Sequence, residues 1–152
     1  MKQILALFAI LAFTVTSQAT TLADFKGTWV GTRNEYVNGT LTTYSQRTTF
    51  RFVNGSLLGN GTIKSGAYTF KASGTYSPDG TYSAALFYSG SVIAISSGRW
   101  NLSGKTIHVS AITRTAAGTQ SGRASLQLLN SRTLVSVGNT SAGNVTITLH
   151  KR

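Results

Sequence analysis

Turn-forming residue pairs recur along most of this chain at intervals of about 8 to 14 residues, and this spacing limits the fold more than any other feature. Asn-Gly and Asp-Gly tolerate the positive φ angles of tight hairpin loops. The clearest turn signals are Asn38-Gly39, Asn54-Gly55, Pro78-Asp79-Gly80, Ser103-Gly104 and Ala142-Gly143-Asn144. The intervening segments are rich in Thr, Ser, Tyr, Val, Ile and Phe, which favour strands. The sequence therefore predicts a series of short hairpins.

Residue alternation indicates that each strand has one face in a core. In residues 43–53 the even positions, which include Gln46, form a largely aromatic face, whereas the odd positions include Arg47 and Arg51. The same period of two recurs in two other segments, with one face formed by Tyr68, Phe70, Ala72 and Tyr76 and another by Val145, Ile147 and Leu149. Because successive strand residues point to opposite faces, the aromatic face is expected to be buried and the basic face exposed.

The predicted fold is all-β, a single antiparallel meander of about eight to ten strands closed into a barrel. No helical periodicity occurs after residue 27, and one helical turn is expected at residues 22–26. Closure removes the unpaired edges that a meander would otherwise expose. An open sandwich is the alternative architecture, and a small outer-membrane barrel, which needs an outward apolar band, is a second.

The first residues have the pattern of a secretory signal. Lys2 precedes an apolar run, residues 4–15, and Ser17 and Ala19 place small residues at a cleavage site. Residues 1–19 are therefore interpreted as a signal peptide and residues 20–152 as one β-barrel domain. The run is too short to span a bilayer as a helix, and the protein is expected to be secreted or periplasmic and not membrane-spanning.

The charge balance is strongly basic, with 14 Lys and Arg against three Asp and Glu, and a formal net charge of +11. Such a field favours anionic partners such as polyanionic polymers or lipid head groups. The alternative is that the charge only maintains solubility. Specific nucleic-acid binding is not expected, because alternation places the aromatic rings on the face opposite the cations.

Few residues are suited to catalysis. Of the acidic residues, only Glu35 lies on a predicted strand, and it is expected to pair with a neighbouring Arg or Lys. His108 and His150 lack metal-ligand spacing, and the chain has no cysteine. The sequence therefore predicts a protein that is not an enzyme and has no catalytic residues, metal or cofactor.

The segment Phe25-Lys26-Gly27-Thr28-Trp29-Val30-Gly31 resembles the opening strand of lipocalin-like (calycin) barrels. The resemblance rests on Gly27 and Trp29, and implies that the Trp closes one barrel end while the lumen holds a small, often apolar ligand. The family's arginine that packs on this Trp has Arg132 and Arg152 as candidates. Avidin-type barrels open similarly, but Val30-Gly31 follows the Trp where they support biotin binding.

The leading prediction is an exported binding protein that holds a small apolar or amphipathic ligand. Its lining or closing rings are predicted from face alternation and from a repeated Gly-x-aromatic pattern to be Trp29, Tyr68, Phe70, Tyr76 and Trp100. One alternative is a filled barrel whose basic exterior binds anionic envelope polymers or a partner protein, through a stripe of Arg47, Arg51, Lys71 and Lys105. Another is an enzyme inhibitor that uses a long loop at residues 113–122.

Overall fold

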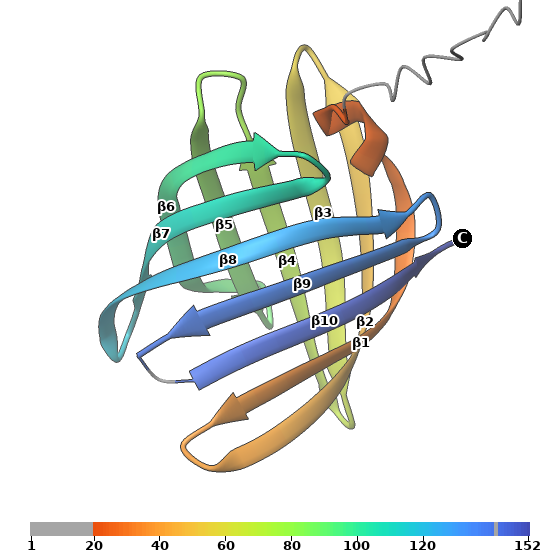
Figure 1. Cartoon of the computed structure of the whole chain (residues 1–152). Coiled ribbons are helices and arrows are strands. Elements are labelled where there is room, and N and C mark those ends of the chain that lie inside the picture. The colour runs from red at the N-terminus through yellow and green to blue at the C-terminus, as the bar shows by residue number, and fades with distance from the viewer. Residues whose placement is uncertain (1–19, 142) are drawn as a thin grey trace, which may run out of the picture.

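A computed structural model describes residues 20–141 and 143–152, and Figure 1 shows its ten strands. A short 3₁₀ helix, η1 (Leu22–Phe25), precedes them, where one helical turn was predicted. The strands are β1 (Gly27–Val37), β2 (Thr40–Val53), β3 (Ser56–Ser65), β4 (Tyr68–Tyr76), β5 (Thr81–Tyr88), β6 (Ser91–Ser103), β7 (Thr106–Thr115), β8 (Gly118–Asn130), β9 (Thr133–Thr140) and β10 (Gly143–Lys151). The all-β prediction is confirmed.

The strands form one antiparallel meander that closes on itself. Each strand pairs with the next, and β10 returns to pair with β1, from Trp29 opposite Lys151 to Val37 opposite Gly143. Closure gives every strand two neighbours, so backbone hydrogen bonds have partners on both sides. The predicted barrel is confirmed, and the open sandwich is ruled out.

The hairpin turns follow the predicted chemistry. Asn38 and Asn54 have φ of 49°, and the glycine after each has φ of 80°, as two-residue loops with positive φ at both positions require. The long loop predicted at residues 113–122 is wrong. Residues 106–115 and 118–130 are strands of a tight hairpin, β7–β8, because the chain turns within Ala116-Ala117 and the sheet continues at once.

The two ends of the barrel differ. Helix η1 covers one end, termed here the closed end, where Phe25, Trp29, Leu57, Ile107 and Leu134 have no exposed surface. The β1–β2, β3–β4, β5–β6, β7–β8 and β9–β10 hairpins turn at the opposite end, termed the open end (Figure 1). The hydrophobic core is therefore concentrated beneath η1, and the lumen extends from it toward the open end.

The predicted signal peptide, residues 1–19, lies outside the described residues. Within residues 20–141 and 143–152 no helix has the length and hydrophobicity needed to cross a membrane.

Candidate functional site

The structure separates the five predicted ring residues into three places. Trp29 and Trp100 lie at the closed end, and Tyr76 lines the lumen next to them. Phe70 and Tyr68 lie near the open end, where Tyr68 is 58% exposed. Tyr68, Phe70 and Tyr76 share one face of β4, as the alternation predicts, but of the five ring residues only Tyr76 lines the main cavity.

Trp29 and Trp100 belong to the floor of the barrel. The Trp29 indole Nε1 donates a hydrogen bond of 2.9 Å to the Phe25 carbonyl, which ties β1 to η1. The Trp100 Nε1 donates one of 2.8 Å to the Ser77 carbonyl in the β4–β5 turn. Each indole N–H already has a partner, so these rings close the end of the lumen without offering a donor to a ligand.

The cation that packs on Trp29 comes from Lys151, and the expectation of Arg132 or Arg152 is wrong. The Lys151 Nζ lies 5.2 Å from the centre of the Trp29 ring. A Cβ at Gly27 would come within 2.6 Å of Lys151 Cε, and Gly27 has φ of 131°. Because β10 pairs Lys151 directly with Trp29, this lysine reaches the ring by crossing the bare glycine. The Gly-x-Trp pattern is thus explained locally, because a side chain at residue 27 would collide with the lysine that packs on Trp29.

The repeated glycine–aromatic pattern does not mark glycines covered by the ring two residues later. The atoms nearest to an added Cβ at Gly27, Gly74 and Gly98 belong to Lys151, Ala84 and Ser110. The glycine that a ring does cover is Gly59, where the Phe50 Cε1 lies 2.7 Å from the Cβ position.

A cavity of about 200 Å³ lies inside the barrel above this floor. Its first wall, on β3–β5, consists mainly of residues with little or no side chain, namely Gly59, Gly61, Ala72, Gly74 and Ala84. The facing wall, on β8–β10, is apolar and consists mainly of Leu126, Leu134, Ile147 and Leu149. These small residues create the space. In a small barrel, side chains of ordinary size in their place would fill the interior.

Several polar side chains also line this largely apolar space, and Gln46, Thr48, Tyr76 and Tyr82 are the ones with described contacts. Gln46 on β2 donates through Nε2 to Thr48 Oγ1 at 3.0 Å, while its buried Oε1 has no hydrogen-bond partner within the described residues. Tyr76 and Tyr82 pack with ring centres 5.2 Å apart and also line the cavity. Burial raises the pKa of both phenols, and the neighbouring Tyr82 raises that of Tyr76 further. Both phenols are therefore neutral hydrogen-bonding groups at physiological pH.

A second chamber of about 180 Å³ adjoins the first. Val109, Ala111, Ala124 and Val145 line it, and Tyr82 lines both chambers. Val37 and Gly143, at the tips of β1 and β10, place this chamber on the side of the open end. Tyr82 therefore borders both chambers, and it does so from the end of β5 that lies at the closed end of the barrel.

Sequence reasoning missed Gln46 and Tyr82 as lumen residues. Gln46 lies at an even position of residues 43–53, on the face predicted to be buried, but nothing in the sequence indicates that its amide oxygen lacks a partner. Tyr82 follows the Pro78-Asp79-Gly80 turn and pairs with Tyr76 across β4 and β5. Placing a hairpin turn at residues 78–80 would have predicted this pairing, and with it the inward position of Tyr82.

The mouth carries an ion pair and an aromatic cluster. Arg33 Nε and Glu35 Oε1 are 2.5 Å apart on β1, with about a quarter of each side chain exposed. The predicted pairing of Glu35 is confirmed. Phe70 contacts Tyr88 and Tyr44, with ring centres 5.1 and 6.4 Å apart, and Tyr68 packs on Tyr88 at 6.1 Å.

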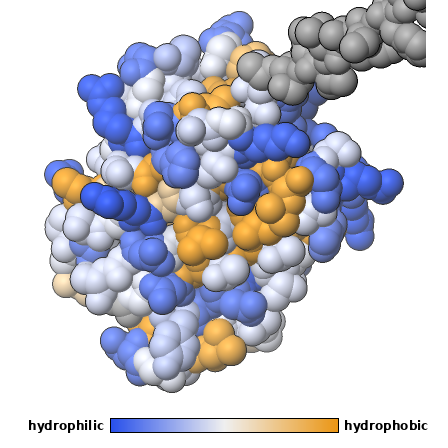
Figure 2. All heavy atoms as spheres, in the orientation of Figure 1, coloured by the Kyte–Doolittle hydropathy of each residue, from blue (hydrophilic) through white to orange (hydrophobic). Residues whose placement is uncertain are grey.

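The basic residues do not form one continuous stripe. Arg47 and Lys71 lie in one row on the outer face, each paired with Thr62 of β3, and Arg51 lies further along β2. Lys105 lies instead in the β6–β7 turn at the closed end, where it lines an open groove with Lys26 and Lys151. The outer face visible in Figure 2 is a mosaic of hydrophobic patches and hydrophilic residues.

Among the described residues, no three His, Asp or Glu side chains come together as metal ligands would.

Comparisons with known proteins identify the fold. The crystal structure of Rv2717c from M. tuberculosis matches with a TM-score of 0.61 and 14% sequence identity, over 86% of this chain and 94% of that chain. No family model matches the sequence. No curated protein matches it either. At this identity the likeness extends to the barrel fold alone.

Proposed function

We propose that this chain is an exported, non-enzymatic binding protein that holds a small, largely apolar ligand in its lumen. The observation that carries the proposal is the Gln46 Oε1, a buried acceptor in the wall of the cavity that has no partner among residues 20–141 and 143–152. An unsatisfied buried acceptor costs about 1–3 kcal/mol. A ligand that donates one hydrogen bond to this oxygen recovers that cost.

The shape and lining of the cavity support a small aromatic or alicyclic ligand. A cavity of about 150 Å³ lined by aliphatic and aromatic side chains accommodates a benzene molecule. The lumen cavity here is somewhat larger, about 200 Å³, and its two main walls are apolar. A ligand of one or two rings with a single hydroxyl or amino donor fits both the volume and the chemistry.

Two matched probes test the donor requirement. 2-Naphthol and 2-methoxynaphthalene have the same ring system, but only the naphthol carries a donor. We expect the naphthol to bind about three- to tenfold more tightly, the worth of one hydrogen bond. The Gln46→Leu variant should lose this preference, because it removes the acceptor while keeping an apolar side chain of similar size.

Gln127→Leu provides the control, because Gln127 is exposed on β8. It should keep the preference for naphthol. Native mass spectrometry of the protein recovered after export adds an independent readout of any ligand already held. Equal affinities for both probes in the unaltered protein, or no binding of either, would refute the lumen proposal.

A second candidate function rests on the closed end. Lys26, Lys105 and Lys151 line a groove of about 670 Å³ there with a single carboxylate, Asp24, which already accepts a hydrogen bond from the Thr21 backbone. We propose that this groove binds an anionic polymer. Binding of heparin as a probe should weaken steeply between low and high salt and weaken further in Lys105→Gln. Binding that is insensitive to salt would exclude it.

A further inference from the structure

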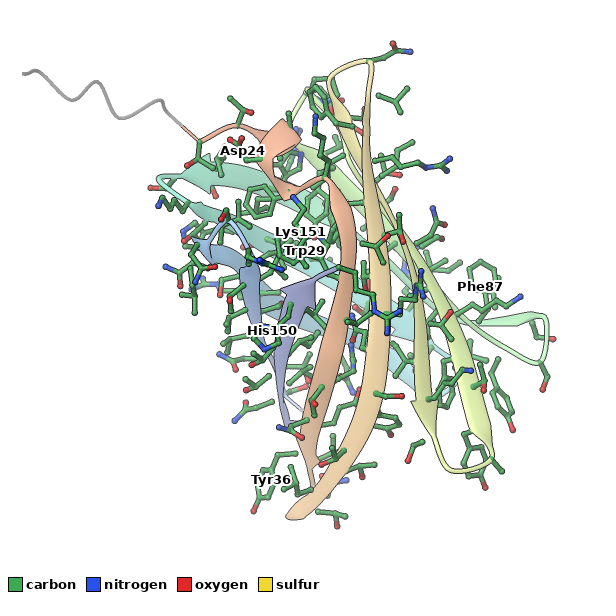
Figure 3. The ribbon with its side chains drawn as sticks, turned by 90° about the vertical axis from the view of Figure 1, so that its right-hand side faces the viewer. Asp24, Trp29, Tyr36, Phe87, His150 and Lys151 are labelled. Carbon is green, nitrogen blue, oxygen red and sulfur yellow. The ribbon has the colours of Figure 1, made fainter. Side chains whose placement is uncertain are left out.

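Just over half of the exposed large hydrophobic side chains among the described residues lie at the open end, while Phe52, Val53 and Leu129 lie at the closed end. Three of the five hairpins at the open end carry the side chains that are defined here as the apolar rim: Tyr36, Val37 and Leu41 on β1–β2, Tyr68 on β3–β4, and Tyr88, Val92 and Ile93 on β5–β6. Leu41 is 63% exposed and Val92 51%. Figure 3 shows Tyr36 at the tip of its hairpin, at the opposite end from Asp24, Trp29 and Lys151.

The apolar rim covers one side of the mouth. The three hairpins belong to six consecutive strands, β1 to β6, which are neighbours in the barrel. The other two hairpins at this end present exposed polar side chains instead, namely Thr115, Thr119, Gln120, Asn139 and Asn144. Scattered surface hydrophobic residues need no explanation, but apolar side chains gathered on one arc of one end indicate an interaction surface.

Charge indicates what this surface contacts. The exposed cations nearest the hairpin tips are Lys64 on β3 and Arg114 on β7. Of the three acidic residues, Asp24 and Asp79 lie at the closed end, and Glu35 is paired with Arg33. The open end therefore presents apolar side chains and cations without a free carboxylate, which complements an anionic lipid surface.

We propose that the apolar rim docks this barrel, mouth first, on a lipid bilayer surface. Three of its seven members are tyrosines, whose amphipathic rings are favoured at the membrane–water interface. The rim residues are spread over the tips of three separate hairpins around an opening. A deformable lipid surface accommodates such separate tips, whereas a rigid protein partner requires a continuous complementary patch.

Docking in this orientation would place the mouth of the lumen against the lipid. An apolar ligand would then pass between bilayer and lumen without crossing water. This extension rests on the proposed lumen function, but docking itself does not, because the rim residues lie outside the main cavity.

The test is flotation of the exported protein with vesicles, after its N-terminus has been established by mass spectrometry. Two vesicle compositions are used, phosphatidylcholine alone and phosphatidylcholine with about a third phosphatidylglycerol. We expect binding to both and stronger binding to the anionic vesicles, since each cation near the surface adds to the attraction. Leu41→Ser combined with Val92→Ser should lower the bound fraction about tenfold, because membrane affinity scales with the apolar area inserted.

Leu129→Ser combined with Val53→Ser is the matched control. Both residues are about half exposed, at 52% and 45%, but lie on strand segments at the closed end. This variant should bind vesicles as the unaltered protein does. The proposal is overturned if neither vesicle is bound, if both double variants lose binding equally, or if Lys105→Gln abolishes binding while the rim variant does not.

A second copy of the chain is the other occupant that the experiment detects. Sedimentation of the protein without vesicles would then show a dimer that the rim variant dissociates, and vesicle binding would be absent. Failure of docking is distinguishable from failure of the lumen proposal, because naphthol affinity is measured without lipid.

Discussion

Gly59 and Gly74 provide a comparison of one substitution at two facing positions. The two residues pair directly across β3 and β4, and both line the main cavity. A Cβ at Gly74 would lie 3.6 Å from the Ala84 Cβ and 3.6 Å from the Ser83 carbonyl oxygen, which are ordinary contacts. A Cβ at Gly59 would lie 2.7 Å from Phe50 Cε1 and 3.1 Å from Cδ1. Alanine therefore fits at Gly74 and collides with a ring at Gly59.

The magnitudes follow from these contacts. Replacing a glycine by alanine where the backbone permits it stabilises a protein by about 0.4–1 kcal/mol, because the unfolded chain loses entropy. Gly74→Ala should show this gain. Gly59→Ala should instead cost about 1–3 kcal/mol, the usual penalty of overpacking, because the added Cβ would displace the buried Phe50 ring from its present packing position. The two variants should differ by about 1.4–4 kcal/mol.

Urea denaturation followed by tryptophan fluorescence measures the difference, with an equal m-value for both variants as the check on comparability. Thermal unfolding should give the same order, with Gly59→Ala melting several degrees below Gly74→Ala. If Gly59→Ala is as stable as Gly74→Ala, the Phe50 ring does not cover Gly59, and the described shape of the cavity wall is wrong.

Three further predictions concern individual polar groups of the barrel. Burial raises the pKa of the Tyr76 and Tyr82 phenols, so the folded protein keeps these protons at pH values above the ordinary tyrosine pKa of about 10. The free energy of unfolding should therefore fall as the pH rises beyond that value. In urea titrations at alkaline pH, Tyr76→Phe should make this fall shallower. Absorbance of phenolate should show two of the six tyrosines ionising only as the protein unfolds. Trp29→Phe leaves the buried Phe25 carbonyl without its donor and should cost about 1–3 kcal/mol in urea unfolding, and an unchanged midpoint would contradict the described floor. Glu35→Gln should change stability by less than about 1 kcal/mol, because its ion pair with Arg33 is partly solvated, and a larger loss would indicate a buried network.

The barrel could be predicted because its determinants are local. Asn38-Gly39 and Asn54-Gly55 specify their own turns, and alternation in residues 43–53 assigns each side chain to the lumen or the exterior. The pairing of β10 with β1 follows once the last strand of the meander lies beside the first. These features depend on residues that are close together in the chain.

The contents of the lumen could not be predicted in the same way. Whether Gln46 Oε1 finds a partner depends on residues from distant strands, and the cavity arises from small residues on β3–β5 facing apolar residues on β8–β10. The cation over Trp29 likewise depends on the register between β1 and β10, which selects Lys151 over its neighbour Arg152. Spacing in the sequence does not determine such long-range registers.

The central claim is that the lumen is a chamber built around the amide oxygen of Gln46. A crystal structure of the exported protein with 2-naphthol tests it most directly. We expect the naphthol ring between the glycine-rich wall of β3–β5 and the apolar wall of β8–β10, with its hydroxyl within hydrogen-bonding distance of Gln46 Oε1. Side chains packed through the whole lumen, with the naphthol bound only on the exterior, would contradict the claim.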